Sequence, residues 1–331
     1  MARNRRDFIK GSAAVSLLGA NSAAAEAVGI PWIGILHSTA LELDLEQAFL
    51  EGLRLQSWEG DPTQQLGSKK EVIIRKIHGG GRYRANSFND LTRGITDLRN
   101  NTSTNLKLIV AAGGLVSGLA SVSITDIPFL VALGRFNATL DKSWIGGFFF
   151  DYPKGATSNQ NLANKISYLS TNYSIDPAKM CLLYNANSNM GSAELGDWQT
   201  LNPNGKYVDA SGGNENRKIN FKKALDDANA ALGGSGARAI VVSADPFFTM
   251  KRARIIRLAQ KSASGLVMCY PFREYFDDAV DPDSGDASSV MSYGPWLRDV
   301  YTKLGSQAGQ ILTNPGTPLS LSQAPSVYNG I

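Results

Sequence analysis

Short apolar runs alternate along the chain with longer segments in which apolar residues recur every three or four positions. Four such runs occupy the first part of the chain, at residues 30–36, 72–77, 106–112 and 127–133. Two later runs of this kind, at 239–244 and 266–270, lack polar alternation, which is typical of parallel strands covered by helices on both faces. After the first run, Leu45, Phe49 and Leu53 recur at helical spacing. This order predicts right-handed βαβ units and a parallel sheet.

A second series of the same kind begins at residue 144. Its apolar runs lie at residues 144–150, 180–184, 239–244 and 266–270, with helical periodicity at 161–169, 218–232 and 295–312. We therefore expect an α/β fold of two doubly wound, parallel-sheet lobes. Residues 198–213 are polar and rich in Gly and Asn, and we expect them to form an insertion.

Polar and aromatic residues gather just past two of these apolar runs. Asp245, Phe247 and Phe248 follow the first run, and the second ends in Tyr270 and is followed by Arg273 and Glu274. Open α/β sheets bind ligands outside the carboxyl ends of their strands. We expect residues 239–274 to form half of a ligand-binding cleft.

The charge of the chain does not indicate a polyanionic partner. The formal net charge is +4 over 331 residues, and the charged residues of positions 1–10 contribute +3 of it (four basic residues and Asp7). The remainder of the chain therefore carries about +1, which predicts no nucleic-acid partner. No run reaches 18 uninterrupted apolar residues, so the sequence predicts no membrane-spanning helix.

The first 27 residues are expected to be a targeting segment. Arg5 and Arg6 are followed by Phe8, Ile9 and Lys10, then by a weakly apolar stretch and small residues. This order resembles a twin-arginine export signal, and the alternative is a frayed basic tail. We expect export to the periplasm, with cleavage near residue 25 or 27.

Catalytic and metal-binding motifs are missing from the sequence. The only histidines, His37 and His78, are too isolated for a metal site, and no nucleophile elbow, zinc-protease helix motif or Walker loop occurs. Cys181 and Cys269 lie within apolar runs and are expected to be buried side chains, although an exported protein could bridge them. We expect no cofactor, no metal and no enzymatic activity.

Six short motifs resemble a known family. They are IGIL at 33–36, AFLEGL at 48–53, WEG at 58–60, SADPFF at 243–248, YPFREY at 270–275 and MSYG at 291–294. Together they resemble the ABC-transporter substrate-binding proteins of periplasmic-binding-protein type I fold, in the subgroup that includes tryptophan and tyrosine uptake proteins. The chain departs from that pattern at residues 198–213, 277–288 and 319–331.

The resemblance implies two lobes that are joined by three crossovers and close on a ligand by a hinge motion. By that topology, residues 30–137 plus 290–314 form the first lobe, and residues 138–289 plus 315–331 form the second. The strand ends that would face the cleft carry the candidate site residues: Ser38, Thr39, Gly113, Gly114, Asn185, Asn187, Asp245, Phe247 and Phe248, joined by Tyr270, Arg273, Glu274 and Tyr293.

These residue types suit the two charged ends of an amino acid. Unpaired N–H groups at the helix starts near Ser38 and Gly113 suit a carboxylate, although the same residues also serve as ordinary N-caps and turns. Asp245 or Glu274 suits an ammonium group, and the aromatic side chains suit a ring or a cation. Asp245 before a proline is also a common turn residue, and Glu274 with Arg273 is also compatible with a simple ion pair.

The sequence therefore predicts a periplasmic, monomeric binding protein for a small molecule, in particular an amino acid or a related carboxylate, that serves an ABC permease. A ligand-sensing module for a signalling receptor has the same fold and remains an alternative. An exported enzyme is a weaker alternative because a nucleophile and base within reach of each other are not evident.

Overall fold

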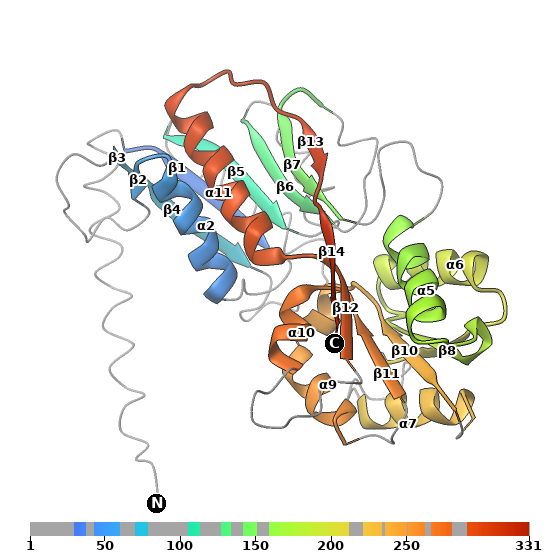
Figure 1. Ribbon diagram of the computed structural model, residues 1–331. Coiled ribbons are helices and arrows are strands. Elements are labelled where there is room, and N and C mark those ends of the chain that lie inside the picture. Colours follow the sequence, from blue (N-terminus) through green and yellow to red (C-terminus); the bar gives the residue numbers. More distant parts are fainter. Residues whose placement is uncertain are drawn as a thin grey trace, which may run out of the picture.

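The chain forms two six-stranded sheets, each packed against helices (Figure 1). This computed structural model describes residues 30–37, 43–59, 70–78, 105–112, 127–133, 142–150, 159–211, 221–233, 236–249, 251–261, 266–279 and 290–330. The expected targeting segment, residues 1–27, lies outside the described residues and stays a prediction.

The first sheet is parallel throughout, with the strand order β13-β7-β6-β5-β1-β4. Its strands are β1 (Trp32–His37), β4 (Ile73–His78), β5 (Leu106–Ala112), β6 (Phe129–Leu133), β7 (Ile145–Phe149) and β13 (Leu321–Gln323). A separate two-stranded pair is formed by β2 (Trp58–Glu59) and β3 (Lys70–Glu71).

The second sheet has the order β14-β12-β11-β10-β8-β9, and only the edge strand β14 runs antiparallel. Its strands are β8 (Met180–Tyr184), β9 (Lys206–Asp209), β10 (Arg238–Val242), β11 (Leu266–Tyr270), β12 (Val290–Pro295) and β14 (Ser326–Gly330). Every residue of β10, β11 and β12 is buried. Their unalternating sequences are thus explained by helices on both faces, and the predicted α/β architecture is confirmed.

Helices cover both sheets (Figure 1). On the first lobe, α2 (Leu43–Leu55) packs against α11 (Leu297–Thr313). On the second, α5 (Gln160–Asn172) and α6 (Asn189–Leu201) share an apolar core with one face of the sheet. The other face packs against α7 (Phe221–Ala231), α9 (Arg252–Ala259) and α10 (Arg273–Ala279), while α8 (Pro246–Thr249) follows β10 and the 3-10 helix η3 (Pro177–Lys179) precedes β8.

The chain crosses between the lobes three times, as the resemblance implies. The crossings lie between β7 and α5, between β12 and α11, and between β13 and β14. Each one leaves a parallel strand at its carboxyl end. The carboxyl edges of both sheets therefore adjoin the boundary between the lobes, which is where ligands bind in open α/β sheets.

The strand pairing places three strands differently from the expected boundaries. β7 joins the first sheet and β12 the second, whereas residues 138–150 were expected in the second lobe and 290–295 in the first. β7 can pair closely with β6 because Gly147 has a φ of 115°, and a Cβ there would lie 2.1 Å from the Val131 oxygen. Residues 315–331 were expected in the second lobe as well, but β13 joins the first sheet and only β14 joins the second.

The expected insertion at residues 198–213 is wrong. Trp198 is fully buried as part of α6, and β9 then adds an edge strand to the second sheet. The many small polar residues there make the turn between the two, where Asn202 ends the helix and its side chain bonds back to the Pro177 oxygen at 3.0 Å.

The two cysteines are free and buried, as expected. Cys181 lies in the core beneath α7, and Cys269 lies in the core beneath α5 and α6. They therefore occupy opposite faces of the second sheet and cannot reach each other. Burial raises the pKa of each thiol to about 12.

Candidate ligand-binding site

The candidate site residues in the second lobe lie at the carboxyl ends of β8, β10 and β11. The expected first-lobe contacts Ser38, Thr39, Gly113 and Gly114 lie outside the described residues, so the carboxylate-binding half of the expected site stays a prediction. The second-lobe side chains divide into those turned toward the helix ends at this edge and those packed into the core behind it.

Asp245 is a buried carboxylate held in a turn. It is 3% exposed, and its Oδ1 accepts a hydrogen bond from the Phe247 N–H at 2.8 Å. Its Oδ2 accepts from the hydroxyl of Ser188 and from the Asn185 amide at 3.4 Å. Burial raises the pKa of Asp245, and these hydrogen bonds oppose the rise. Asp245 therefore joins the end of β10 to the beginning of α6.

Asn185 and Asn187 have different surroundings. Asn185 is 7% exposed and its Oδ1 accepts from the Asn187 N–H at 3.1 Å. Asn187 is exposed, so its side-chain amide is available at the surface of this edge.

The aromatic candidates are mostly core residues. Phe248 and Tyr270 are 0% and 1% exposed. Phe248 meets Phe247 at a ring distance of 5.1 Å, and Tyr270 stacks on Tyr275 at the same distance. Burial raises the pKa of the Tyr270 hydroxyl. Phe248 and Tyr270 therefore pack in the core behind the carboxyl edge of the second sheet, whereas Phe247 is only half-buried.

Glu274 joins the two lobes. It begins α10 of the second lobe and is 6% exposed, and its Oε1 accepts from the Arg298 N–H at 2.9 Å, at the start of α11. Its Oε2 has no hydrogen-bond partner within the described part of the chain, although it is buried. Burial raises the pKa of Glu274 to about 7. A buried carboxylate oxygen with a free acceptor position is unusual and indicates a missing donor.

Arg273 does not pair with Glu274. Its guanidinium lies 4.6 Å from the centre of the Trp296 ring and 3.4 Å from the Asp277 carboxylate. Trp296 lies in the crossing between β12 and α11. Arg273 is therefore held against the hinge rather than against its neighbour.

Further charged side chains bridge the lobe boundary near Glu274. Arg252 of α9 lies 2.6 Å from Asp278 of the same lobe and 3.9 Å from Asp44 of α2, in the first lobe. These three groups come from elements that the sequence analysis did not connect.

Tyr293 borders an open hollow at the hinge. The hollow has a volume of about 320 Å³ and is lined by Gln160, Asn161, Asn164, Tyr293, Gln323, Ala324, Pro325 and Ser326. Its polar groups largely bond to one another: the Asn164 amide donates to the Tyr293 hydroxyl at 2.6 Å, and the Ser326 hydroxyl donates to Asn161 at 3.0 Å. The hollow therefore ties the crossings together and offers few free donors or acceptors.

Among the buried charges that the sequence analysis missed, two lie on the helices behind the candidate site. Lys165 of α5 is 2% exposed and Glu194 of α6 is 4% exposed. The signal was available, because Lys165 lies three residues after Leu162 and four before Leu169, on the apolar face of its helix. Glu194 lies four residues before the buried Trp198 in the same way.

The described residues contain no group of three or more acidic, Cys or His side chains placed to hold a metal ion. Among the helices in the described ranges, none combines the length and the apolar character needed to cross a membrane.

Two lobes with parallel-dominated sheets and three crossings define the periplasmic-binding-protein type I fold. No family model and no curated protein matches the chain, but solved structures of this fold do. An ABC domain from Streptococcus pneumoniae in complex with L-Trp is similar with a TM-score of 0.60 and 11% identity, over 91% of this chain and 92% of that one.

Two further solved structures have the same fold. An ABC sugar transporter subunit from Rhodobacter sphaeroides has a TM-score of 0.56 and 14% identity, over 91% of this chain and 98% of that one. A branched-chain amino acid transporter substrate-binding protein from Streptococcus pneumoniae, in complex with isoleucine, has a TM-score of 0.52 and 11% identity, over 86% and 83%. These similarities establish the fold.

Proposed function

We propose that this chain is a solute-binding protein that captures a small molecule between its lobes and delivers it to an ABC permease. The observation that carries the proposal is the position of the three crossings, each leaving the carboxyl end of a parallel strand. Both ligand-binding edges thus border one boundary that a hinge can open and close. Similar folds that bind amino acids and sugars support this class of function.

The ligand is an amino acid, with its ammonium group bound by the acids of the second lobe. Glu274 Oε2 supports this because it is buried and has no partner among the described residues. Asp245 supports it as well, since the described residues give this carboxylate three donors but no ion pair. An ammonium group would supply the missing positive charge and the missing donor. The ligand's carboxylate would then bind near Ser38 and Gly113.

The chain works as an exported monomer in the periplasm without a cofactor. A sensing role for a signalling receptor would use the same lobes and the same ligand, and an enzyme would have to turn the ligand over. Recovery of chemically unchanged ligand after prolonged incubation argues against the enzyme. Binding to a permease in detergent, dependent on ligand, would separate transport from sensing.

The test is a thermal-shift screen of the purified protein against the standard L-amino acids and small carboxylates. A ligand that binds only the folded state raises the melting temperature, by an amount equivalent to about 2.7 kcal/mol at a concentration of 100 times its Kd. We expect one chemical class to do so, with sugars as the comparison class. If every amino acid and carboxylate leaves the melting temperature unchanged, the proposed ligand class is wrong.

A further inference from the structure

Two opposite charges are buried behind the candidate site. Lys165 of α5 and Glu194 of α6 are both almost fully buried in the second lobe. Burial raises the pKa of Glu194, and the positive charge of Lys165 opposes that rise. Keeping two charges out of water is costly, and apolar residues of similar size fill such a space at least as well. The two buried charges therefore call for an explanation beyond packing.

Glu194 contacts the turn that carries Asp245. Its Oε2 accepts hydrogen bonds from the Ser243 hydroxyl at 2.5 Å and from the Ala244 N–H at 3.1 Å. The Ser243 hydroxyl in turn accepts from the Asp245 N–H at 3.2 Å. We call residues 243–245 the wall turn. Ser243 is 0% exposed, so these bonds are shielded from water and are the stronger for it.

The wall turn is tied to α6 at a second point. The hydroxyl of Ser188, the N-cap of α6, accepts from the Gly191 N–H at 2.8 Å and donates to Asp245. The Asp245 carboxylate of the wall turn thus bonds to the N-cap of α6, and the Glu194 carboxylate of α6 bonds to the wall turn. These two contacts involve different helical turns of α6. Together they fix both the position and the orientation of the wall turn, whereas one contact alone would leave it free to rotate.

We propose that Glu194 is a positioning residue that holds the wall turn so that Asp245 is aimed at a ligand's cationic group. The positioning itself follows from the hydrogen bonds of Glu194. The part of this proposal that concerns the ligand rests on the proposed function, because it assumes that Asp245 contacts the ligand.

The experiment compares two double variants that both remove the buried charges. Lys165→Met with Glu194→Leu also removes the acceptor for Ser243 and Ala244, whereas Lys165→Met with Glu194→Gln keeps an acceptor oxygen. Since both variants are free of an unpaired buried charge, both are expected to fold. Ser243→Ala is a third, milder variant that removes one donor of the tie and keeps the test open if the Leu variant does not fold.

Three readouts are measured for each: the melting temperature, hydrogen exchange of the Ala244 amide, and affinity for L-tryptophan and L-isoleucine by calorimetry. We expect the Leu variant to melt below the Gln variant, because it leaves the buried donors of Ser243 and Ala244 without an acceptor. Its Ala244 amide should exchange at least tenfold faster than in the Gln variant, and its affinity should fall at least tenfold. If Glu194 served stability alone, the Leu variant would melt at a lower temperature while its ligand affinity stayed unchanged.

Equal protection of the Ala244 amide in the Leu and Gln variants would overturn the positioning role. Faster exchange of the Ala244 amide with unchanged ligand affinity would overturn the claim that the wall turn aims Asp245 at the ligand. If the unaltered protein binds neither amino acid, the failure belongs to the proposed ligand class, and the exchange of Ala244 still decides whether Glu194 holds the turn.

Discussion

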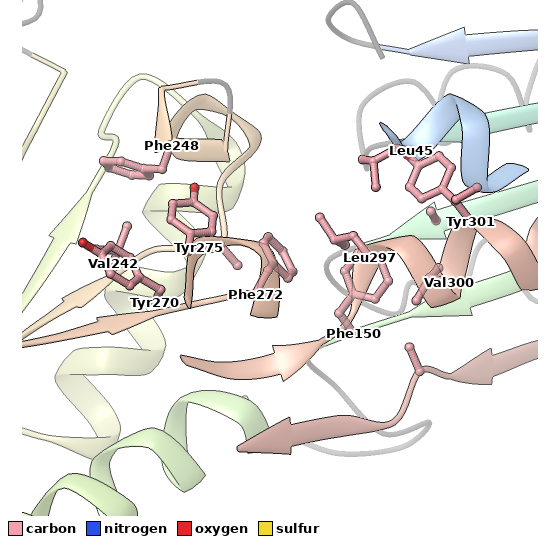
Figure 2. Packing of buried hydrophobic residues seen from close by; sticks show 14 of the residues in the cluster. Leu45, Phe150, Val242, Phe248, Tyr270, Phe272, Tyr275, Leu297, Val300 and Tyr301 are labelled. Carbon is pink, nitrogen blue, oxygen red and sulfur yellow. The ribbon is translucent and has the colours of Figure 1, made fainter. Parts of the chain in front are cut away.

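Phe150 and Phe272 meet edge to face at the boundary between the lobes, with their ring centres 5.9 Å apart and their planes at 79°. Phe150 follows β7 of the first sheet, and Phe272 follows β11 of the second. In Figure 2 the two rings lie close to Leu297, at the start of α11. The cores of the two lobes are thus continuous at the hinge.

We predict a measurable coupling between these two rings. Phe150→Leu and Phe272→Leu each shrink one ring, and the double variant should lose less stability than the two single losses summed. An aromatic pair of this geometry contributes about 0.5–1.5 kcal/mol beyond its buried area. Urea denaturation of the parent, the two single variants and the double variant measures the coupling. Strictly additive losses would mean that the contact has no energetic role.

Close packing of α2 on α11 leads to a second prediction. A Cβ on Gly305 would lie 2.0 Å from the Phe49 oxygen, so Gly305→Ala must push the helices apart. We expect a loss of about 1–3 kcal/mol or more from overpacking. Gly196, inside α6, is the matched control, because a Cβ there has nothing within 4 Å.

Gly196→Ala should stabilise the protein by about 0.5–1 kcal/mol, since alanine is the better helix former. Thermal denaturation of both variants checks the difference in sign. Equal effects at the two positions would contradict the packing of α2 on α11.

The regular elements were predictable because they depend on local pattern. Apolar runs predicted β1, β4, β5, β6, β7, β8, β10 and β11, and a 3.6-residue period predicted α2, α5, α7 and α11. The short edge strands β9, β13 and β14 lack such runs and were not predicted. Sheet membership was not predictable in the same way. The pairing of β7 with β6 depends on the positive φ of Gly147 and on its approach to Val131, neither of which is visible as periodicity.

Side-chain direction limited the prediction of the site. Alternation places Cys269 and Tyr270 on opposite faces of β11, but pattern alone does not say which face packs beneath which helices. The structure turns Tyr270 toward Tyr275, into the core. Glu194 was missed for a related reason, because its role depends on Ser243, which is 49 residues distant in the chain.

Asp245 leads to a prediction about binding. Asp245→Asn keeps an oxygen that accepts from the Phe247 N–H, but its amide nitrogen replaces the oxygen that accepts from Ser188 and Asn185. The fold should survive with a loss of about 1–3 kcal/mol. Loss of the negative charge should weaken binding of any ligand that carries an ammonium group at least tenfold, which the thermal shift would report. Retained affinity would remove Asp245 from the site and leave Glu274 as the acid to test.

The raised pKa of Glu274 predicts how the stability of the fold depends on pH. Its pKa is raised from 4.5 to about 7 in the folded chain, so the folded state binds this proton more tightly than the unfolded state. The contribution of Glu274 to stability is therefore highest below about pH 4.5 and declines as the pH rises toward 7. In the protonated form, the Oε2 atom no longer has to remain charged without a donor.

Glu274→Gln should remove this dependence, because an amide does not titrate. The stability of the variant relative to the parent should increase as the pH rises from 5 to 8, by up to about 3 kcal/mol for a pKa difference of this size. The hydrogen bond from the Arg298 N–H to the carboxylate opposes the rise of this pKa and is therefore already part of the predicted gain. Urea denaturation of both proteins at several pH values gives the difference, which cancels the other titrating groups. Parallel curves would show that the Glu274 carboxyl titrates alike in the folded and unfolded chains.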